Sequence, residues 1–232
     1  MKRKRLSKAT RQFILGVIVV TLATVLVIVA VNIYDAFRDN TPTSNDPSSG
    51  SGDATKTQAE IDAETVATLG RLAVPDYVNQ DFINPSRART GLALEGLHNI
   101  VIHYTGNPGT TAKQNRNYFG KPDTLVCSHF LIGLEGEIIQ CIPLDEQSAA
   151  SNHRNIDTVS IEVCHPDKTG KFNEATYESL VRLTAWLCSN TSLTEADIIR
   201  HHDITGKQCP KYFVDDPKAW EQFKVDVGKK IR

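Results

Sequence analysis

The sequence predicts an α/β domain with a mixed central β-sheet flanked by helices, preceded by one transmembrane helix. Three observations lead to this prediction. Residues 13–33 form an uncharged and almost wholly apolar run. After residue 73, short segments rich in β-branched residues alternate with helical patterns, as in α/β proteins. Two of these segments are separated only by a short glycine-containing turn, so one pair of strands is expected to be antiparallel.

The N-terminal run has the length of a membrane span. About 20 apolar residues cross a hydrocarbon core at about 1.5 Å per residue. A cleaved signal peptide is the alternative, but its apolar core is only about 7–15 residues long. Residues 1–12 carry six lysines and arginines and no acidic residue. Because basic residues stay on the cytoplasmic side, we expect a single-pass cell-membrane protein with a cytoplasmic N-terminus and an extracytoplasmic remainder.

Residues 34–72 are predicted to be a flexible extracytoplasmic linker. Residues 39–56 are rich in Thr, Pro, Ser, Asn and Gly and have almost nothing apolar to bury. Within the linker, residues 58–72 place apolar side chains near helical spacing and predict a short helix. Of the 26 basic residues, the 20 that remain after residue 12 face 27 acidic ones, a net charge of −7. This balance gives no support to nucleic-acid binding, and the sequence indicates no protein partner.

Residues 73–232 are enough for one domain with a hydrophobic core. Four segments predict strands because they are short and rich in β-branched or large apolar residues. The predicted strands are residues 99–104, 128–134, 137–142 and 158–163. The turn at residues 134–137 predicts a hairpin between the second and the third.

Two helices are expected after the strands. Residues 173–188 place one apolar stripe at helical spacing, with Asn173 as the N-cap. A last helix is expected to begin at Asp216-Pro217, since Asp caps helices and Pro is favoured at the first helical position. Its predicted buried face consists of Trp220, Phe223 and Val227.

The cysteine count is five, which is odd. Outside the cytoplasm, cysteines that can pair are expected to form disulfides. Cys127 and Cys141 lie near opposite ends of the predicted hairpin, and their spacing leaves both a disulfide and free thiols open. Cys164 and Cys188 fall within apolar patterns and are predicted to be buried thiols.

Two distant segments contain residues suited to a metal site. His103 closes an apolar predicted strand, while His201 and Cys209 bracket a short polar turn. Zinc binds imidazole nitrogen and thiolate sulfur, and a catalytic zinc site keeps its fourth position open. These three residues therefore predict a three-ligand Zn²⁺ site. Lys207, two residues before Cys209, is then expected beside the metal.

The segments Ile100–Gly106 and Arg200–Pro210 resemble the paired signatures of the zinc-dependent type 2 N-acetylmuramoyl-L-alanine amidases. Relatives of this family include bacteriophage lysozyme-type amidases and peptidoglycan recognition proteins. The resemblance extends from about residue 75 to the C-terminus, with the motifs in the family's order. It implies the family's α/β fold, a zinc cofactor, and peptidoglycan or muropeptides as partner. The implied reaction is hydrolysis of the amide bond between N-acetylmuramic acid and L-alanine by zinc-activated water.

The resemblance also implies roles for single residues. Glu162 matches the catalytic glutamate that many members use as a general base. Lys207 matches the lysine thought to stabilise charge on the tetrahedral intermediate. His153 resembles a histidine that lines the peptide cleft, and Asn107 begins a loop that, with the helix after it, frames the cleft. We therefore predict that His153 and Asn107 bind substrate.

One position departs from the family. Some bacteriophage members place a catalytic tyrosine directly before the residue that matches His129, and this chain has Ser128 there. The role of general base therefore falls to Glu162, and His129 is predicted to be structural. Beside the ligand His201, Asp203 is expected to fix the turn or to support a ligand, and His202 is the alternative ligand if the assignment of His201 is wrong.

Two other functions compete with an amidase. A membrane-anchored, non-catalytic binder or sensor of peptidoglycan or muropeptides is the first, although members that only bind commonly lack the cysteine that is present here as Cys209. A purely structural zinc site is the second. Such a site normally has four protein ligands, and His202 is the one further candidate in these two motifs.

Overall fold

The structure is a computed structural model and describes residues 56–231. In that range, no helix combines the length and the apolar character needed to cross a bilayer. The predicted transmembrane helix at residues 13–33 and the basic segment before it lie outside the described residues. The prediction of a membrane anchor therefore stays a prediction.

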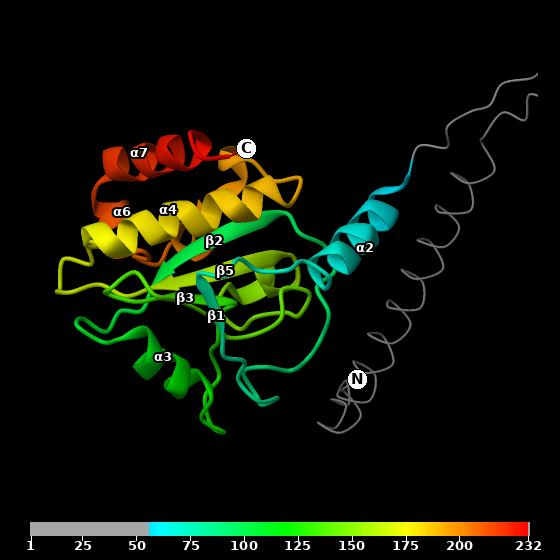
Figure 1. Ribbon diagram of the computed structural model, residues 1–232, viewed down its shortest axis with the longest axis horizontal. Coiled ribbons are helices and arrows are strands. Elements are labelled where there is room, and N and C mark those ends of the chain that lie inside the picture. Colours follow the sequence, from blue (N-terminus) through cyan, green and yellow to red (C-terminus); the bar gives the residue numbers. More distant parts are fainter. Residues whose placement is uncertain (1–55, 232) are drawn as a thin grey trace, which may run out of the picture. The chain divides into compact units, whose positions relative to one another are not determined.

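A six-stranded mixed sheet forms the centre of the domain, in the order β1-β4-β3-β5-β2-β6 (Figure 1). β3 and β4 are antiparallel, and every other neighbouring pair is parallel. The strands are β1 (Val78–Gln80), β2 (Asn99–Tyr104), β3 (Phe130–Ile132), β4 (Ile138–Gln140), β5 (Thr158–Val163) and β6 (Ile198–Arg200). All four predicted strands and the predicted hairpin are confirmed, with β3 and β4 shorter than expected. The three-residue strands β1 and β6 were not predicted.

Helices cover both faces of this sheet. They are α2 (Gln58–Leu69), α3 (Ala112–Phe119), α4 (Glu174–Ser189), α5 (His201–Thr205), α6 (Lys211–Asp215) and α7 (Pro217–Gly228), with 3₁₀ helices η1 (Asn152–Ile156) and η2 (Glu195–Asp197). Figure 1 shows α4 and α7 over one face and α3 under the other. A mixed α/β fold with helices on both faces is therefore confirmed for the described residues.

Side-chain alternation along β2 and β5 divides the core into two clusters. Ile100 and Ile102 of β2 and Val159 and Ile161 of β5 pack in the cluster that includes α4 and α7. A smaller cluster joins the opposite face to α3, through residues such as Leu131. Because successive strand residues point to opposite faces, the polar residues between the apolar ones lie on the α3 side.

The two helices predicted to follow the strands begin where the sequence indicated. The Asn173 side chain accepts a hydrogen bond from the Thr176 backbone N–H and caps α4. The Asp216 carboxylate accepts from two backbone N–H groups and caps α7, with Pro217 at the first position. The predicted apolar face of α7, Trp220, Phe223 and Val227, is buried. Both predicted helices are confirmed.

α2 occupies the last part of the segment predicted as linker. Thr57 and Glu60 form a capping box at its start. Its Leu69 side chain is 3% exposed and belongs to the larger core cluster. α2 therefore belongs to the same compact unit as the rest of the described residues, and the short helix expected from residue 58 onward is confirmed.

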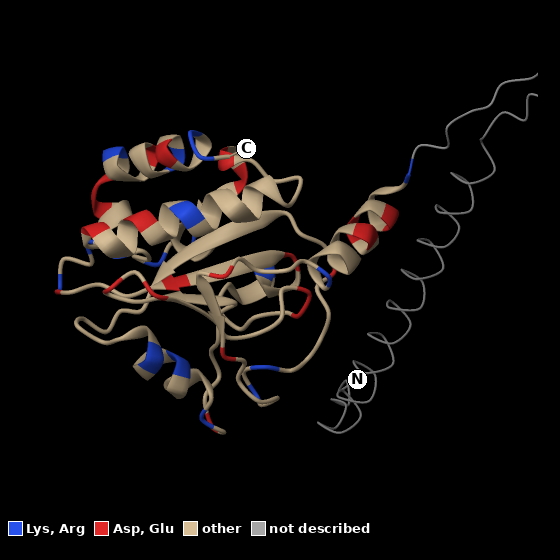
Figure 2. Ribbon diagram, in the orientation of Figure 1, with Lys and Arg blue, Asp and Glu red and all other residues tan. Residues whose placement is uncertain are grey.

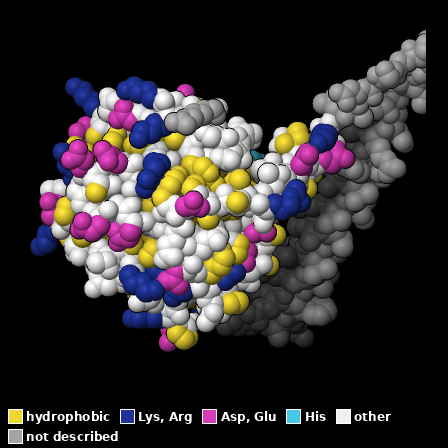
Figure 3. Space-filling view, in the orientation of Figure 1, with side chains coloured by type: hydrophobic (Ala, Val, Ile, Leu, Met, Phe, Trp, Pro, Cys, Tyr) yellow, Lys and Arg dark blue, Asp and Glu magenta, His cyan; other side chains and the backbone are white. Residues whose placement is uncertain are grey.

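Charged residues of both signs are interspersed on the described surface. α2 carries only acidic charges, whereas Lys113 and Arg116 of α3 both form ion pairs with Asp81 (Figure 2). On the face in Figure 3, hydrophobic side chains gather in the middle, with charges of both signs around them. This face therefore lacks the dense positive charge that phosphate neutralisation requires.

All five cysteines lie in the described part of the chain, and each is a free, buried thiol. The buried thiols predicted at Cys164 and Cys188 are confirmed. Of the two alternatives for Cys127 and Cys141, the structure has the free thiols. Burial raises the pKa of Cys127 to about 11, which disfavours its thiolate near neutral pH.

His129 is fully buried and held by hydrogen bonds to both ring nitrogens. The backbone N–H of Ser160 donates to Nδ1 at 3.0 Å, and Nε2 donates to the carbonyl oxygen of Glu146 at 2.9 Å. Burial lowers the pKa of His129 from 6.5 to about 4, because an apolar surrounding disfavours the charged ring. These contacts agree with the structural role expected for His129.

We predict that His129 makes the domain less stable in mild acid. Its pKa is lower in the folded state, so the unfolded state takes up the proton first and stability falls as the pH drops from 6.5 toward 4. Between pH 7 and pH 5 this contribution amounts to about 2 kcal/mol. Urea unfolding of a fragment of residues 57–232 with chelator present, compared with His129→Gln, measures it. An equal acid loss in both proteins would contradict the assignment.

Candidate metal centre and active-site cleft

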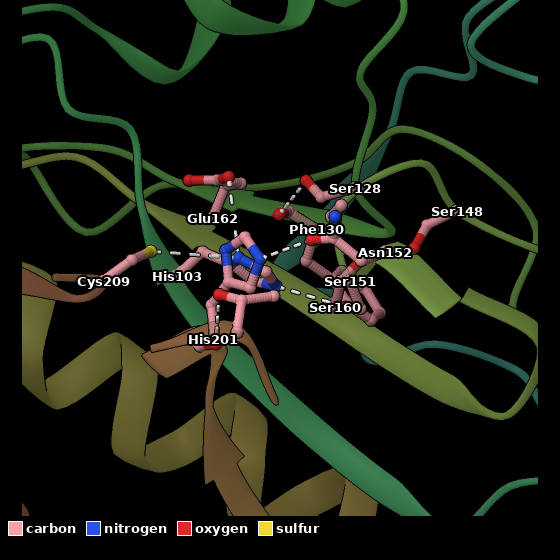
Figure 4. A network of polar contacts seen from close by, with 12 residues as sticks. His103, Ser128, Phe130, Ser148, Ser151, Asn152, Ser160, Glu162, His201 and Cys209 are labelled. Atoms are coloured by element: carbon pink, nitrogen blue, oxygen red, sulfur yellow. Dashed lines mark hydrogen bonds and ion pairs between the residues drawn. The ribbon is translucent and has the colours of Figure 1, made fainter. Parts of the chain in front are cut away.

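Three side chains from distant parts of the sequence converge at the carboxyl end of β2. His103 lies near the end of β2, His201 begins α5 directly after β6, and Cys209 lies in the loop that follows α5. Figure 4 shows the three side chains gathered at one place. One ligand atom from each lies within 4.8 Å of the others, and all three residues are buried. The structure thus brings together the three residues predicted as metal ligands.

A short turn returns the chain from His201 to Cys209. Gly206 ends α5 at a φ of 74°, a left-handed conformation that glycine adopts without a steric cost. The backbone N–H of His202 donates to the Cys209 carbonyl at 2.8 Å, and its Nδ1 lies 2.8 Å from the Lys207 carbonyl oxygen. His202 therefore holds the turn and is not one of the three clustered residues. Asp203 also serves the turn, through an ion pair with Arg200.

Strand register places Glu162 beside the cluster. β2 and β5 are parallel, with His103 directly opposite Glu162. Glu162 Oε1 lies 4.0 Å from His103 Nδ1, while Oε2 is buried without a hydrogen-bond partner. Burial raises the pKa of Glu162 to about 8. A carboxyl group in this environment is stable only when it is protonated or when a cation lies close to its negative charge.

The electrostatics of the cluster fit a bound divalent cation. Burial lowers the pKa of His103 and, to a smaller extent, of His201, and the charge of Lys207 lowers both further. Both imidazoles are therefore neutral, as metal ligation requires. Burial and the nearby Glu162 raise the pKa of Cys209 to about 12. A cation bound here would stabilise the Cys209 thiolate and the Glu162 carboxylate, and two imidazoles with one thiolate are donors that zinc prefers.

A cleft of about 390 Å³ opens over Glu162 and His201. Asn107 and Lys207 line it, as expected for residues predicted to act on substrate. His153 is exposed on η1 and is not among the lining residues, whereas its neighbour Asn152 is. The structure therefore brings Asn107, but not His153, to the cleft.

Several lining residues were not singled out from the sequence. They include Thr105, Leu125, Val126, Asn152 and Asn155, whereas Asn115 and Tyr118 belong to the helix that was expected to frame the cleft. Thr105 had a usable signal, since it follows His103 by two residues and so points to the same side of the sheet. Its Oγ1 is buried without a hydrogen-bond partner, as is Glu162 Oε2. Two unpaired polar atoms at one cleft mark it as a place where a polar ligand binds.

Ser128 takes no part in the cleft. Its side chain is fully buried and its hydroxyl donates to the Phe130 carbonyl at 2.8 Å. The position at which some bacteriophage amidases carry a catalytic tyrosine is thus a structural serine in this chain. Glu162, whose side chain is 19% exposed and whose Oε2 is buried, is the carboxyl group next to the three-residue cluster.

The matching family model is described as N-acetylmuramoyl-L-alanine amidase and covers residues 95–212, half of the chain. The chain therefore belongs to the N-acetylmuramoyl-L-alanine amidase family. It is 32% identical over 164 residues to the N-acetylmuramoyl-L-alanine amidase BlyA of Bacillus subtilis (strain 168), covering 62% of this chain and 44% of that one. It is 29% identical over 156 residues to the amidase CwlL of Bacillus licheniformis, covering 60% and 43%. The chain thus spans less than half the length of these two curated relatives.

Solved structures support the same fold. The catalytic domain of XlyA is 27% identical, with a TM-score of 0.57, and the match covers 65% of this chain and 99% of that one. The PlyG catalytic domain, at 20% identity and a TM-score of 0.59, covers 66% and 94% and shows the fold alone. The fold implied by the sequence resemblance is confirmed.

We predict that the cluster binds one zinc ion per chain and that each of its three residues is needed. His103→Ala, His201→Ala and Cys209→Ser each remove one of three donors, so each variant should lose bound zinc at a metal concentration that saturates the wild type. Elemental analysis after dialysis measures the zinc content. His98→Ala, which changes an exposed histidine away from the cluster, is the matched control. Full zinc content in any one of the three ligand variants would contradict the assignment of that residue.

Proposed function

We propose that this chain is a zinc-dependent N-acetylmuramoyl-L-alanine amidase that hydrolyses the amide bond between N-acetylmuramic acid and L-alanine in peptidoglycan. The observation that carries the proposal is the convergence of His103, His201 and Cys209 next to Glu162, at one end of an open cleft. Membership of the amidase family supports the reaction. Peptidoglycan or muropeptides are the proposed substrates, on the strength of the relatives' activity.

His103, His201 and Cys209 would hold the zinc ion. A zinc ion with three protein ligands acidifies bound water and polarises the carbonyl group to be attacked. The buried position of Cys209 and the neutral state of both imidazoles suit this task. The three-ligand arrangement leaves one position for water or substrate, which favours a catalytic over a structural site.

Glu162 is the proposed general base. It takes the proton from the attacking water and passes it to the leaving L-alanine nitrogen. Its unpaired Oε2 is free to accept that proton, and the adjacent Oε1 lies 4.0 Å from His103 Nδ1. Lys207 lines the same cleft, so its ammonium can stabilise the negative charge that develops on the amide oxygen.

The chain is further proposed to be anchored in the cell membrane by residues 13–33. The apolar run and the basic residues before it support this proposal. An extracytoplasmic catalytic domain on a linker would then reach wall material close to the membrane surface.

We predict that Glu162→Gln and Lys207→Met each slow hydrolysis by about 100-fold or more and keep the zinc ion. Loss of a general base costs about 10²–10⁴ in rate, and loss of a group that stabilises the oxyanion costs about 10²–10³. The measurement is the release of new L-alanine amino termini from purified peptidoglycan, together with the zinc content of each variant. The exposed residues Glu178 and Lys218 provide matched controls, as Glu178→Gln and Lys218→Met.

Three outcomes separate the competing functions. New L-alanine termini that disappear with a chelator and return with zinc support the amidase. Wild-type rates in both site variants would reject the roles of Glu162 and Lys207. If the wild type binds zinc and muropeptides but releases no new amino termini, the result would instead select a binder or sensor.

We also predict that the full-length chain remains in the membrane fraction after a high-salt wash and is released by detergent. Removal of residues 1–33 should move it to the soluble fraction, because the apolar run is lost. Fractionation followed by immunoblotting measures this. A full-length chain that washes off with salt would refute the anchor.

A further inference from the structure

Both histidines of the cluster make a second contact on the side away from Cys209. His103 Nδ1 lies 3.9 Å from Cys209 Sγ, and its other nitrogen, Nε2, lies 3.4 Å from Ser151 Oγ. His201 Nε2 lies 2.8 Å from Asn152 Oδ1. Figure 4 shows Ser151 and Asn152 on one side of the two rings and Cys209 on the other. Two consecutive residues thus hold the outer nitrogens of both rings.

The Asn152 contact fixes which nitrogen of His201 carries the proton. An amide oxygen is only an acceptor, so Nε2 must be the protonated nitrogen that donates to it. In a neutral imidazole the lone pair is then on Nδ1. The equivalent contact of His103 also uses Nε2, which leaves its Nδ1 toward Cys209. The tautomer of His201 is therefore set to present Nδ1 to a metal, and the ring of His103 is oriented with its Nδ1 on the Cys209 side.

The backbone around Asn152 is shaped for this contact. Within residues 56–231, Asn152 is the one non-glycine residue with a positive φ, at 57°. Asparagine tolerates this left-handed conformation better than most residues, at some cost in strain. The Asn155 side chain fixes the turn by accepting from the backbone N–H groups of Ala150 and Ser151 at 3.1 and 2.7 Å. The turn thus orients two successive side chains toward two different rings.

We propose that Ser151 and Asn152 are positioning residues for the metal site: Asn152 locks His201 in the Nε2-protonated tautomer, and Ser151 holds the ring of His103 in place, so that both histidines can bind zinc through Nδ1. The proposal deepens the proposed zinc amidase and rests on it. Outer partners of metal-binding histidines raise ligand basicity and fix the ring, and their loss costs about 10–100-fold in metal affinity. Asn152 makes the shorter of the two contacts and is expected to contribute more.

The test uses the full-length chain and Asn152→Gly. Glycine adopts a positive φ freely, so this variant removes the side chain and keeps the turn. We expect zinc affinity, measured by competition with a chromophoric chelator, to fall about 10–100-fold. Asn152→Asp retains an acceptor oxygen and is expected to restore most of the zinc affinity that Asn152→Gly loses. Asn190→Gly, at the C-terminal end of α4, is the matched control for the same chemical change.

A second readout detects the tautomer itself. With ¹⁵N-labelled histidine and no zinc, NMR spectra should show His201 protonated on Nε2 in the wild type and a mixture of tautomers in Asn152→Gly. A residue that only maintained the turn would change neither the tautomer nor the zinc affinity when replaced by glycine.

The outcomes keep this proposal separate from the proposed function. If the wild type binds no zinc, the proposed zinc amidase fails. If the wild type binds one zinc ion and Asn152→Gly binds it equally well with an unchanged tautomer, only the role of Asn152 is overturned. A larger loss in Ser151→Ala than in Asn152→Gly would contradict the ranking of the two residues.

Discussion

The site depends on the parallel pairing of β2 with β5, which sets His103 directly opposite Glu162. Ile100 and Ile102 of β2 and Val159 and Ile161 of β5 point to the face covered by α4 and α7, so their burial fixes the register. A shift by one residue would turn His103 and Glu162 into the apolar core. The same burial that stabilises the sheet therefore places a metal donor, His103, beside Glu162, a carboxyl group that lines the cleft.

Burial also explains why this group of residues suits a cation. Without one, the pKa of Glu162 is raised to about 8 and that of Cys209 to about 12, because both negative charges are desolvated. The positive charge of Lys207 lies at the cleft, outside the three-residue cluster. A divalent ion among the three donors would offset the cost of desolvating the Glu162 and Cys209 charges. Its binding free energy would also stabilise the folded turn at residues 201–209, which carries two of the three donors.

Periodicity and caps made much of the fold predictable. β2, β5, α4 and α7 have continuous apolar patterns, and Asn173 and Asp216 cap the two helices as expected. The strands β1 and β6 are three residues long, which is too short to show a period. The three metal-binding candidates were identifiable because their spacing matches a family. Asn152 could not be identified from the sequence, because its contact with His201 depends on a positive φ and on a partner 49 residues away. The sequence analysis selected the neighbouring His153 instead.

The central claim is that two imidazoles and one thiolate bind zinc in this chain. X-ray absorption at the zinc edge of the purified full-length protein tests it most directly. We predict one sulfur neighbour at about 2.3 Å and two nitrogen neighbours at about 2.0–2.1 Å, with a further light atom completing four-coordination. A zinc environment without sulfur, or one made only of oxygen atoms, would show that His103, His201 and Cys209 do not form the metal site.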